Sequence, residues 1–171
     1  MGALETGKYV SLLVEGRGNV IRRAWDTLEG LPGGKRLFSE FVGRAATYTG
    51  TIGAVVIELR QGFARVEMRD RAGVRNHLSC VHAIALANLA ELTGNIAMGY
   101  SLPDDARFIV AGLSIEYLKK ARGTITGECH APIVSRSTRE EYPVEVVMRD
   151  VAGDVVARAT LRTLVGPKRA P

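Results

Sequence analysis

The sequence has 171 residues, of which 46% are hydrophobic and 24% are charged, and it predicts one globular domain with a substantial core. Its 23 basic and 18 acidic side chains leave a net charge of +5 that is spread along the chain, which argues against nucleic acid binding. Two cysteines give no disulfide framework, and the chain shows neither a signal peptide nor an apolar run of about 20 residues. We therefore expect a cytoplasmic protein that does not bind a membrane.

The first 50 residues predict two helices. Asn19 is a good N-cap for a helix over residues 20–30, in which apolar residues recur at helical spacing. The sequence LPGG at 31–34 interrupts this pattern, and a second helix is expected over residues 35–46. We assign residues 1–45 to an N-terminal helical extension.

The hydrophobic period changes to two after this extension, which indicates β-strands. Strands are expected over 51–62 and 63–70, followed by a loop at 71–80. Residues 80–100 are apolar on nearly every side of a helix, and such a helix is normally buried. A curved sheet wrapped around this single central helix would bury it.

Four further strands follow the helix. They are expected over 107–121, over 123–133 and in a hairpin at 145–165 with AGD as its turn. This order of elements predicts an α+β fold with an antiparallel sheet over residues 46–166, which leaves 167–171 as a disordered tail. Alternate residues of the first of these strands are expected to share one face, namely Ile109, Ala111, Leu113, Ile115 and Tyr117.

Three polar residues carry a resemblance to a known family. Asn76, His82 and Glu91 form the pattern N-x5-H-x8-E, which LAE closes. This pattern resembles the acyl-CoA thioesterases of the hotdog fold, including those of the phenylacetate pathway, whose motif is N-x-x-G-x-x-H-G-G followed by L-A-D or L-A-E. The sequence at 148–159 is also similar to the last hairpin of that family. The resemblance covers residues 46–165 and implies a hotdog fold that forms homodimers or tetramers.

The motif departs from the family at two places. Ser79 stands where the family often has glycine, and HAI, from His82 to Ile84, replaces H-G-G. The added Cβ atoms lie where a thioester would approach the start of the central helix. A hotdog protein that binds acyl-CoA or another lipid ligand without turnover is therefore the alternative function. Hydration of an enoyl thioester is a third, although the chain lacks the histidine before a Pro-Gly turn that this reaction uses.

The start of the central helix suits thioester hydrolysis. This reaction develops negative charge on the carbonyl oxygen, and unpaired N–H groups at a helix N-terminus stabilise such charge. With Ser79 as the predicted N-cap, the backbone N–H of Ala83 is the candidate oxyanion donor. The resemblance implies that Glu91 is the general base or the nucleophile. Asn76 and His82 would position the substrate.

The spacing of Ala83 and Glu91 adds a constraint. Eight residues of α-helix separate them by about 12 Å along the axis, at about 1.5 Å per residue. One thioester carbon cannot contact both positions of the same helix, so catalysis requires Glu91 from a second copy of the chain. We therefore expect a homodimer or tetramer that acts on an acyl-CoA thioester. No cofactor is expected beyond the coenzyme A of the substrate.

Other residues are candidates for substrate binding. Asn88, Glu91 and Asn95 form a polar stripe at helical spacing, so the two asparagines are expected to pair with Glu91. Ser114 and Tyr117 come from the strand over 107–121, and a basic cluster that ends this strand could meet the phosphates of coenzyme A. This cluster consists of Lys119, Lys120 and Arg122.

Simpler roles remain open for several of these residues. Glu91 could be a buried structural acid that fixes the register of a dimer. Cys80 could be a nucleophile with His82 as its base, although buried cysteine is common as a small apolar residue. Cys129 and His130 could join His82 around a metal ion, but their spacing matches no zinc pattern, so we predict no metal site.

Overall fold

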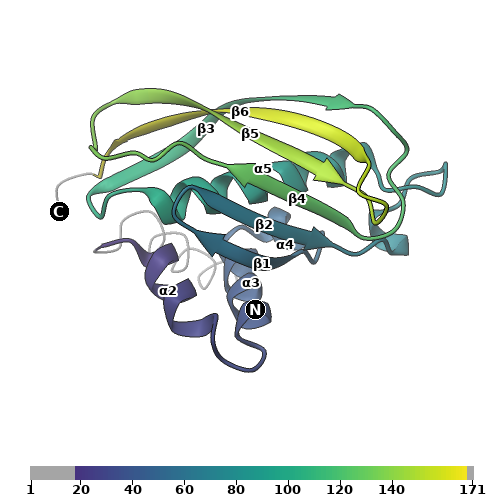
Figure 1. The fold of residues 1–171 in the computed structure, drawn as a ribbon, viewed down its shortest axis with the longest axis horizontal. Coiled ribbons are helices and arrows are strands. Elements are labelled where there is room, and N and C mark those ends of the chain that lie inside the picture. The colour runs from purple at the N-terminus through teal and green to yellow at the C-terminus, as the bar shows by residue number, and fades with distance from the viewer. Residues whose placement is uncertain (1–17, 169–171) are drawn as a thin grey trace.

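A six-stranded antiparallel sheet curves around one long helix, α5 (Ala83–Ser101), as Figure 1 shows. The structure is a computed structural model, and it describes residues 18–168. The strand order across the sheet is β1-β2-β4-β5-β6-β3, and every neighbouring pair is antiparallel. This is the predicted α+β arrangement of a sheet wrapped around a central helix.

The strands follow the predicted hydrophobic pattern, with two before α5 and four after it. They are β1 (Val55–Arg60), β2 (Phe63–Met68), β3 (Ala106–Tyr117), β4 (Ile125–His130), β5 (Glu140–Arg149) and β6 (Val155–Pro167). A short 3-10 helix, η1 (Ala72–Val74), lies in the loop before α5. The predicted hairpin is formed by β5 and β6, and in its turn Gly153 adopts φ 86 and donates its N–H to Asp150 O at 3.0 Å.

Between residue 18 and the sheet the chain forms three helices, α2 (Val20–Leu28), α3 (Gly34–Ala45) and the single turn α4 (Thr47–Gly50). The first two confirm the helices predicted from the sequence, and Asn19 is the N-cap of α2 as expected. Residues 1–17 of the predicted extension lie outside the described residues. At the other end of the chain Pro167 completes β6, whereas 169–171 of the predicted tail also lie outside the described residues.

The concave side of the sheet buries α5, as its apolar sequence predicts. Leu89, Ala97 and Met98 are completely buried, and they belong to one core cluster with inward-facing side chains of the strands. Trp25 of α2 and Phe38 of α3 belong to the same cluster, with their rings edge to face and 5.1 Å between centroids. The N-terminal helices therefore share the core of the sheet.

The predicted face of β3 is wrong in its first half, because the strand contains a β-bulge. The pairing with β6 shifts between Val110 and Gly112, so Ala111 has no partner residue there. The extra residue reverses the alternation of side chains. Ile109 therefore points outward and is 66% exposed, whereas Leu113 pairs with the buried Leu161 on the inward side.

The edge of the sheet at β1 is covered by α3. Ser39 Oγ accepts the N–H of Val56 at 2.9 Å, and Lys35 Nζ donates to Ile57 O at 2.7 Å. These contacts satisfy backbone groups that an edge strand otherwise leaves open. The opposite edge is the 12-residue strand β3, which pairs with a single neighbour, β6.

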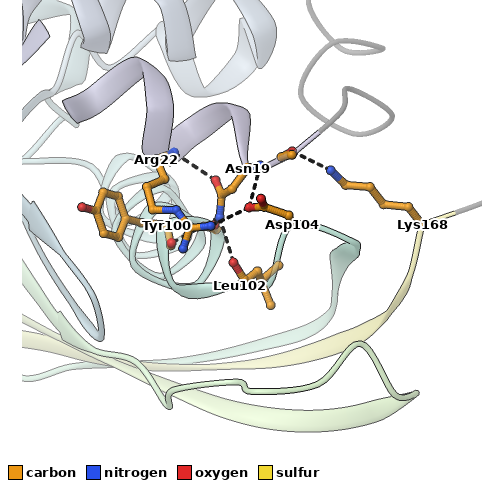
Figure 2. A network of polar contacts seen from close by, with 8 residues as sticks. Asn19, Arg22, Tyr100, Leu102, Asp104 and Lys168 are labelled. Carbon is orange, nitrogen blue, oxygen red and sulfur yellow. Dashed lines mark hydrogen bonds and ion pairs between the residues drawn. The ribbon is translucent and has the colours of Figure 1, made fainter. Parts of the chain in front are cut away.

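One buried side chain joins α2 to the end of α5 (Figure 2). Asn19 Oδ1 caps α2 by accepting the N–H of Arg22 at 2.9 Å. Its Nδ2 group donates to Gly99 O, Tyr100 O and Leu102 O at 2.7, 3.2 and 3.0 Å, carbonyls at the C-terminus of α5. Asn19 therefore caps the beginning of one helix and the end of another.

Charged side chains surround this junction, as Figure 2 also shows. Asp104 Oδ1 accepts the Asn19 N–H at 3.1 Å and forms an ion pair with Arg22 at 2.6 Å. Lys168 Nζ donates to Gly18 O at 2.8 Å, which fixes the end of the described chain next to its beginning. The C-terminal end of α5 is thus firmly held.

Candidate active site

The loop between β2 and α5 places Asn76 near the start of the helix. Asn76 Oδ1 accepts the backbone N–H groups of Leu78 at 2.9 Å and Cys80 at 3.4 Å, so this oxygen organises its own loop. The Nδ2 group of Asn76 has no hydrogen-bond partner among residues 18–168. This donor is the part of the side chain that is left to contact a ligand.

The same loop is anchored by Asp70, whose side chain is 8% exposed. The carboxylate accepts Arg75 Nε at 2.7 Å and the Gly123 N–H at 3.0 Å. The hydrogen bond from Arg75 is the main cause that holds the pKa of Asp70 below its usual range, and the Gly123 contact adds to it. Asp70 therefore stays ionised at neutral pH and fixes the loop that carries Asn76.

The helix begins later than predicted, at Ala83, and His82 rather than Ser79 is its N-cap. His82 Nδ1 accepts the N–H of Ile84 at 3.1 Å. Ser79 does not cap the helix because it turns the chain with φ 54, a left-handed conformation that favours glycine. Among the described residues it is the one non-glycine residue with positive φ, which gives a physical reason for glycine at this place in the family motif.

Ala83 is the first residue of α5, and its N–H has no hydrogen-bond partner within the described part of the chain. The hydroxyl of Tyr117 donates to Ala83 O at 3.1 Å, which holds the end of β3 against the helix start. Burial raises the pKa of Tyr117, so the phenol remains a proton donor at neutral pH. A free backbone donor at a helix start can stabilise an oxyanion.

A cleft of about 340 Å³ opens at this helix start. It brings together several predicted site residues, namely Asn76, Ala83, Tyr117, Lys119 and Lys120. The apolar part of its wall was missed by the sequence analysis, and it includes Leu78 and Leu118, which are 50% and 48% exposed. The available signal for this wall was one leucine in the predicted loop at 71–80 and another near the end of the strand predicted over 107–121.

The predicted basic cluster is only partly free to bind phosphates. Lys119 Nζ forms ion pairs with Asp150 at 2.9 Å and Asp154 at 2.5 Å, two acids that the sequence analysis did not connect to it. The hydrogen bond from Lys119 lowers the pKa of Asp150. Lys120 and Arg122 are exposed and have no ion-pair partner among the described residues.

Glu91 is exposed, which corrects the expectation that it lies in the core. Its apolar sequence neighbours occupy other sides of the helix, because successive residues point in different directions. The expected pairing with the asparagines is also wrong. Asn88 Nδ2 donates instead to Tyr48 O at 3.1 Å, and the buried Oδ1 atoms of Asn88 and Asn95 have no partner within residues 18–168.

Apolar side chains are exposed both on α5 and on the edge strand β3. Ile84 lies two turns before Glu91 on the same side and is 53% exposed. The inward-facing side chains of Leu113 and Tyr117 on the edge strand β3 are 39% and 46% exposed. We call this surface, made of Ile84, Leu113, Tyr117 and Glu91, the open face. It combines apolar side chains with one carboxylate.

Six predicted site residues do not line the cleft, namely Glu91, Asn88, Asn95, Arg122, Ser114 and His82. Ser114 pairs with Thr160 and is exposed on the outer face of the sheet, near Glu145. His82 lines a depression of about 190 Å³ with Asn88 and Tyr48, on another side of the helix start. The structure therefore divides the candidates into a cleft group, a helix-side group and one residue on the outer face.

The cysteines and the suggested metal ligands do not come together. Cys80 is buried next to Asn76, with 3.4 Å between Sγ and Oδ1, and Cys129 lies in the core, where burial raises its pKa to about 12. His130 is exposed and its ring lies 5.0 Å from that of Phe63. Among residues 18–168 no three histidine, cysteine or acidic side chains are grouped so that they could hold a metal ion.

The comparisons with known proteins agree with this fold. The family model of a domain of unknown function, DUF4442, matches residues 34–165. A structural-genomics crystal structure, target APC5556, is 30% identical and has a TM-score of 0.74, with 86% of this chain and 98% of that chain covered. A search of curated proteins found no match.

Two further crystal structures of similar fold carry thioesterase names. One, from Pseudomonas aeruginosa, is described as a protein of unknown function and probable thioesterase; it is 24% identical, with a TM-score of 0.69 and coverage of 80% of this chain and 97% of that one. The other is a thioesterase from Haemophilus influenzae, with 13% identity, a TM-score of 0.66 and coverage of 77% and 92%. The predicted resemblance to hotdog thioesterases is thereby confirmed as a likeness of fold.

Within residues 18–168, no helix combines the length and the apolar character that crossing a bilayer demands.

Proposed function

The chain belongs to the DUF4442 family and has a hotdog fold, and from this premise we propose that it hydrolyses acyl-CoA thioesters at a site shared between two copies of the chain. The observation that carries this proposal is that the N–H of Ala83, at the start of α5, has no hydrogen-bond partner within residues 18–168. Ala83 lines a cleft together with Asn76 and Tyr117.

In this mechanism the thioester carbonyl oxygen lies at the start of α5. The N–H of Ala83 and the Nδ2 group of Asn76 donate to it and stabilise the negative charge of the tetrahedral intermediate. Glu91 of the second copy takes a proton from the attacking water, or attacks the carbonyl carbon itself. If Glu91 acts as the base, the C–S bond then breaks, the free acid is released and the proton held by Glu91 passes to the coenzyme A thiolate. If Glu91 attacks, the C–S bond breaks to leave a mixed anhydride on Glu91, and water hydrolyses this anhydride to the free acid and supplies the proton for the thiolate.

The open face supports the shared site. Within one chain the helix start and Glu91 are about 12 Å apart at about 1.5 Å per residue, so they cannot act on the same carbon. The edge strand β3 pairs only with β6 within residues 18–168, so it can pair with β3 of a second copy, and the exposed Ile84, Leu113 and Tyr117 would then be buried. Such a dimer would place a carboxylate of one copy near the helix start of the other.

The cleft also suits the coenzyme A part of the substrate. Lys120 lines it and Arg122 is exposed nearby in sequence, and neither side chain forms an ion pair with a described residue. Phosphate groups of coenzyme A would be attracted by these two cations. Lys119 would contribute less, because Asp150 and Asp154 already neutralise its charge.

Binding without turnover is the second candidate function, and two observations favour it. The side chains of Ala83 and Ile84 replace the glycines of the family motif, and Asn76 Oδ1 is already used within its loop. A protein of this kind would bind coenzyme A esters tightly and release no thiol.

The experiment is a measurement of coenzyme A release from a panel of acyl-CoA esters, scored by chromatography. Wild type, Glu91→Gln and the matched control Glu29→Gln, an exposed acid at the end of α2, are compared. We expect turnover by wild type and the control and a loss of at least about 100-fold in Glu91→Gln. Tight ester binding with no release by wild type would instead support the binding function.

A further inference from the structure

A second cavity, of about 560 Å³, lies between α3, α4 and β1. This volume is in the range of sites for small molecules, which is about 300–1,000 Å³. None of the cleft residues of the candidate active site lines this cavity. It is therefore a separate feature of the chain.

Two glycines set the shape of this cavity. The chain turns sharply from α3 into α4, and Gly43 and Gly50 face each other across the turn. A Cβ atom on Gly50 would lie 2.6 Å from Gly43 O, so a larger residue would push the two segments apart. The close approach of these segments leaves open space on the side of β1.

The inner wall of the cavity is apolar. Val42 of α3, Val56 of β1 and Leu92 of α5 are 8%, 1% and 7% exposed and form its deep side. Ala54 and Val55 line it nearer to solvent. Such a wall gains free energy by covering an apolar ligand.

Two of the polar groups in the lining are already satisfied. The Ser39 hydroxyl donates to Lys35 O at 2.7 Å and accepts the Val56 N–H at 2.9 Å. The Thr51 hydroxyl donates to Tyr48 O at 2.6 Å. Binding a polar ligand would therefore gain little from either hydroxyl, because both already form hydrogen bonds within the protein.

The charged residues of the lining are paired with one another. Glu40 lies between Arg36 and Arg44 along α3, with N–O distances of 3.4 and 3.7 Å, and all three side chains are exposed by 45% or more. They form a solvated rim and leave no buried charge inside. The cavity is therefore suited to an uncharged chain rather than to an anion.

The cavity is connected to the proposed site through α5. Leu92, which forms part of its deep side, directly follows Glu91 in the helix. Asn88 binds Tyr48 of α4, so the same stretch of helix contacts the segment that borders the cavity. A thioester carbon placed at Glu91 would have this apolar space close to its acyl side.

We propose that the cavity between α3, α4 and β1 binds the acyl tail of the substrate, an unbranched alkyl chain of medium length. The inference rests on the proposed function and adds that the two copies supply different parts of each site. The copy that supplies Glu91 also holds the tail, whereas the other copy supplies the helix start and the coenzyme A cleft.

The test fills the cavity with Ala54→Phe and compares it with Ala152→Phe, the same substitution in the exposed β5–β6 turn. kcat/KM is measured for saturated esters from acetyl-CoA to palmitoyl-CoA. We expect Ala54→Phe to lose at least about tenfold with octanoyl-, decanoyl- and dodecanoyl-CoA and to stay within about twofold with acetyl-CoA. Ala152→Phe should keep the wild-type profile. An unchanged chain-length profile in Ala54→Phe would overturn the inference and leave the thioesterase proposal intact.

Calorimetric titration with dodecanoate gives a readout that does not depend on turnover. Wild type should bind this probe, and Ala54→Phe should weaken binding at least about tenfold. If wild type hydrolyses no ester but binds dodecanoate with this sensitivity, the cavity assignment stands and the hydrolase proposal fails. If dodecanoate binding is equal in both proteins, or absent in wild type, the cavity does not hold an acyl chain.

Discussion

The two ends of α5 differ in how their backbone groups are satisfied. At the C-terminal end, the buried Asn19 donates to three carbonyls, and Asp104 and Lys168 reinforce the junction with α2 (Figure 2). At the N-terminal end, the N–H of Ala83 has no partner within residues 18–168, and the residues around it line a cleft.

This difference indicates that one end of α5 contributes to stability and the other to activity. Carbonyls that are hydrogen-bonded at a helix end add to stability, whereas an unpaired donor at a helix start is available to bind an anion or an oxyanion. Substitutions at the Asn19 junction should therefore change the free energy of unfolding. A substitution that removes the N–H of Ala83 should change activity.

The largest expected effect is that of Ala83→Pro. Proline is favoured at the first position of a helix, and His82 already has the extended backbone that precedes proline, so the fold should be kept while one N–H is removed. We expect kcat with the best acyl-CoA ester to fall about 100- to 1,000-fold. Ala83→Gly, which keeps the N–H, is the matched control and should remain active. Full activity in Ala83→Pro would exclude this donor from the mechanism.

The second effect concerns the opposite end of the helix. Asn19→Ala removes the cap of α2 and leaves carbonyls at the end of α5 unsatisfied. The free energy of unfolding, measured in urea, should therefore fall by about 2–4 kcal/mol. Asn19→Asp keeps the acceptor for Arg22 but loses the NH2 group that donates to the three carbonyls, and it should also be destabilised. Below the melting temperature kcat should be unchanged. An Asn19→Ala protein as stable as wild type would mean that this junction adds little to the free energy of unfolding.

The sequence predicted much of this fold for local reasons. The Asn19 cap, the helix over 80–100 and the hairpin at 145–165 depend on residues close to one another in the chain. The second role of Asn19 could not be predicted, because its partners lie 80 or more residues away. The bulge at Ala111 was missed for a similar reason, since it depends on the pairing of β3 with β6.

The site was predicted in part. Asn76, Ala83 and Tyr117 do meet in one cleft, because the loop, the helix start and the strand end converge there. Ser79 is a better cap by residue type than His82, so the sequence placed the helix start too early. The exposure of Glu91 was missed because its apolar neighbours turn to other sides of the helix.

A smaller effect is expected at the N-cap of α5. His82→Ala removes the acceptor for the Ile84 N–H and should lower the free energy of unfolding by about 1 kcal/mol, measured by urea denaturation. His82→Asn offers a side-chain acceptor again and should restore that stability. If His82→Ala is as stable as wild type, the hydrogen bond at the helix start contributes nothing to the free energy of unfolding. The two ends of α5 would then differ even more in how much they stabilise the fold.

The smallest effect is expected at Ser79. Its φ of 54 strains a residue that carries a Cβ, so Ser79→Gly should raise the free energy of unfolding by less than about 1 kcal/mol. Ser79→Ala keeps the Cβ and should give no such gain. Thermal unfolding of the three proteins measures this difference. A less stable Ser79→Gly protein would show that the serine hydroxyl compensates for the strain.

The central claim is that the helix start of one copy acts together with Glu91 of another, and mixing two inactive variants tests it most directly. Ala83→Pro and Glu91→Gln would be unfolded together, refolded at equal concentration and assayed against each variant alone. Random pairing makes half of the dimers mixed, and each of these has one intact site, so about a quarter of wild-type activity should return. If the mixture is no more active than its parents, the site is not shared in this way.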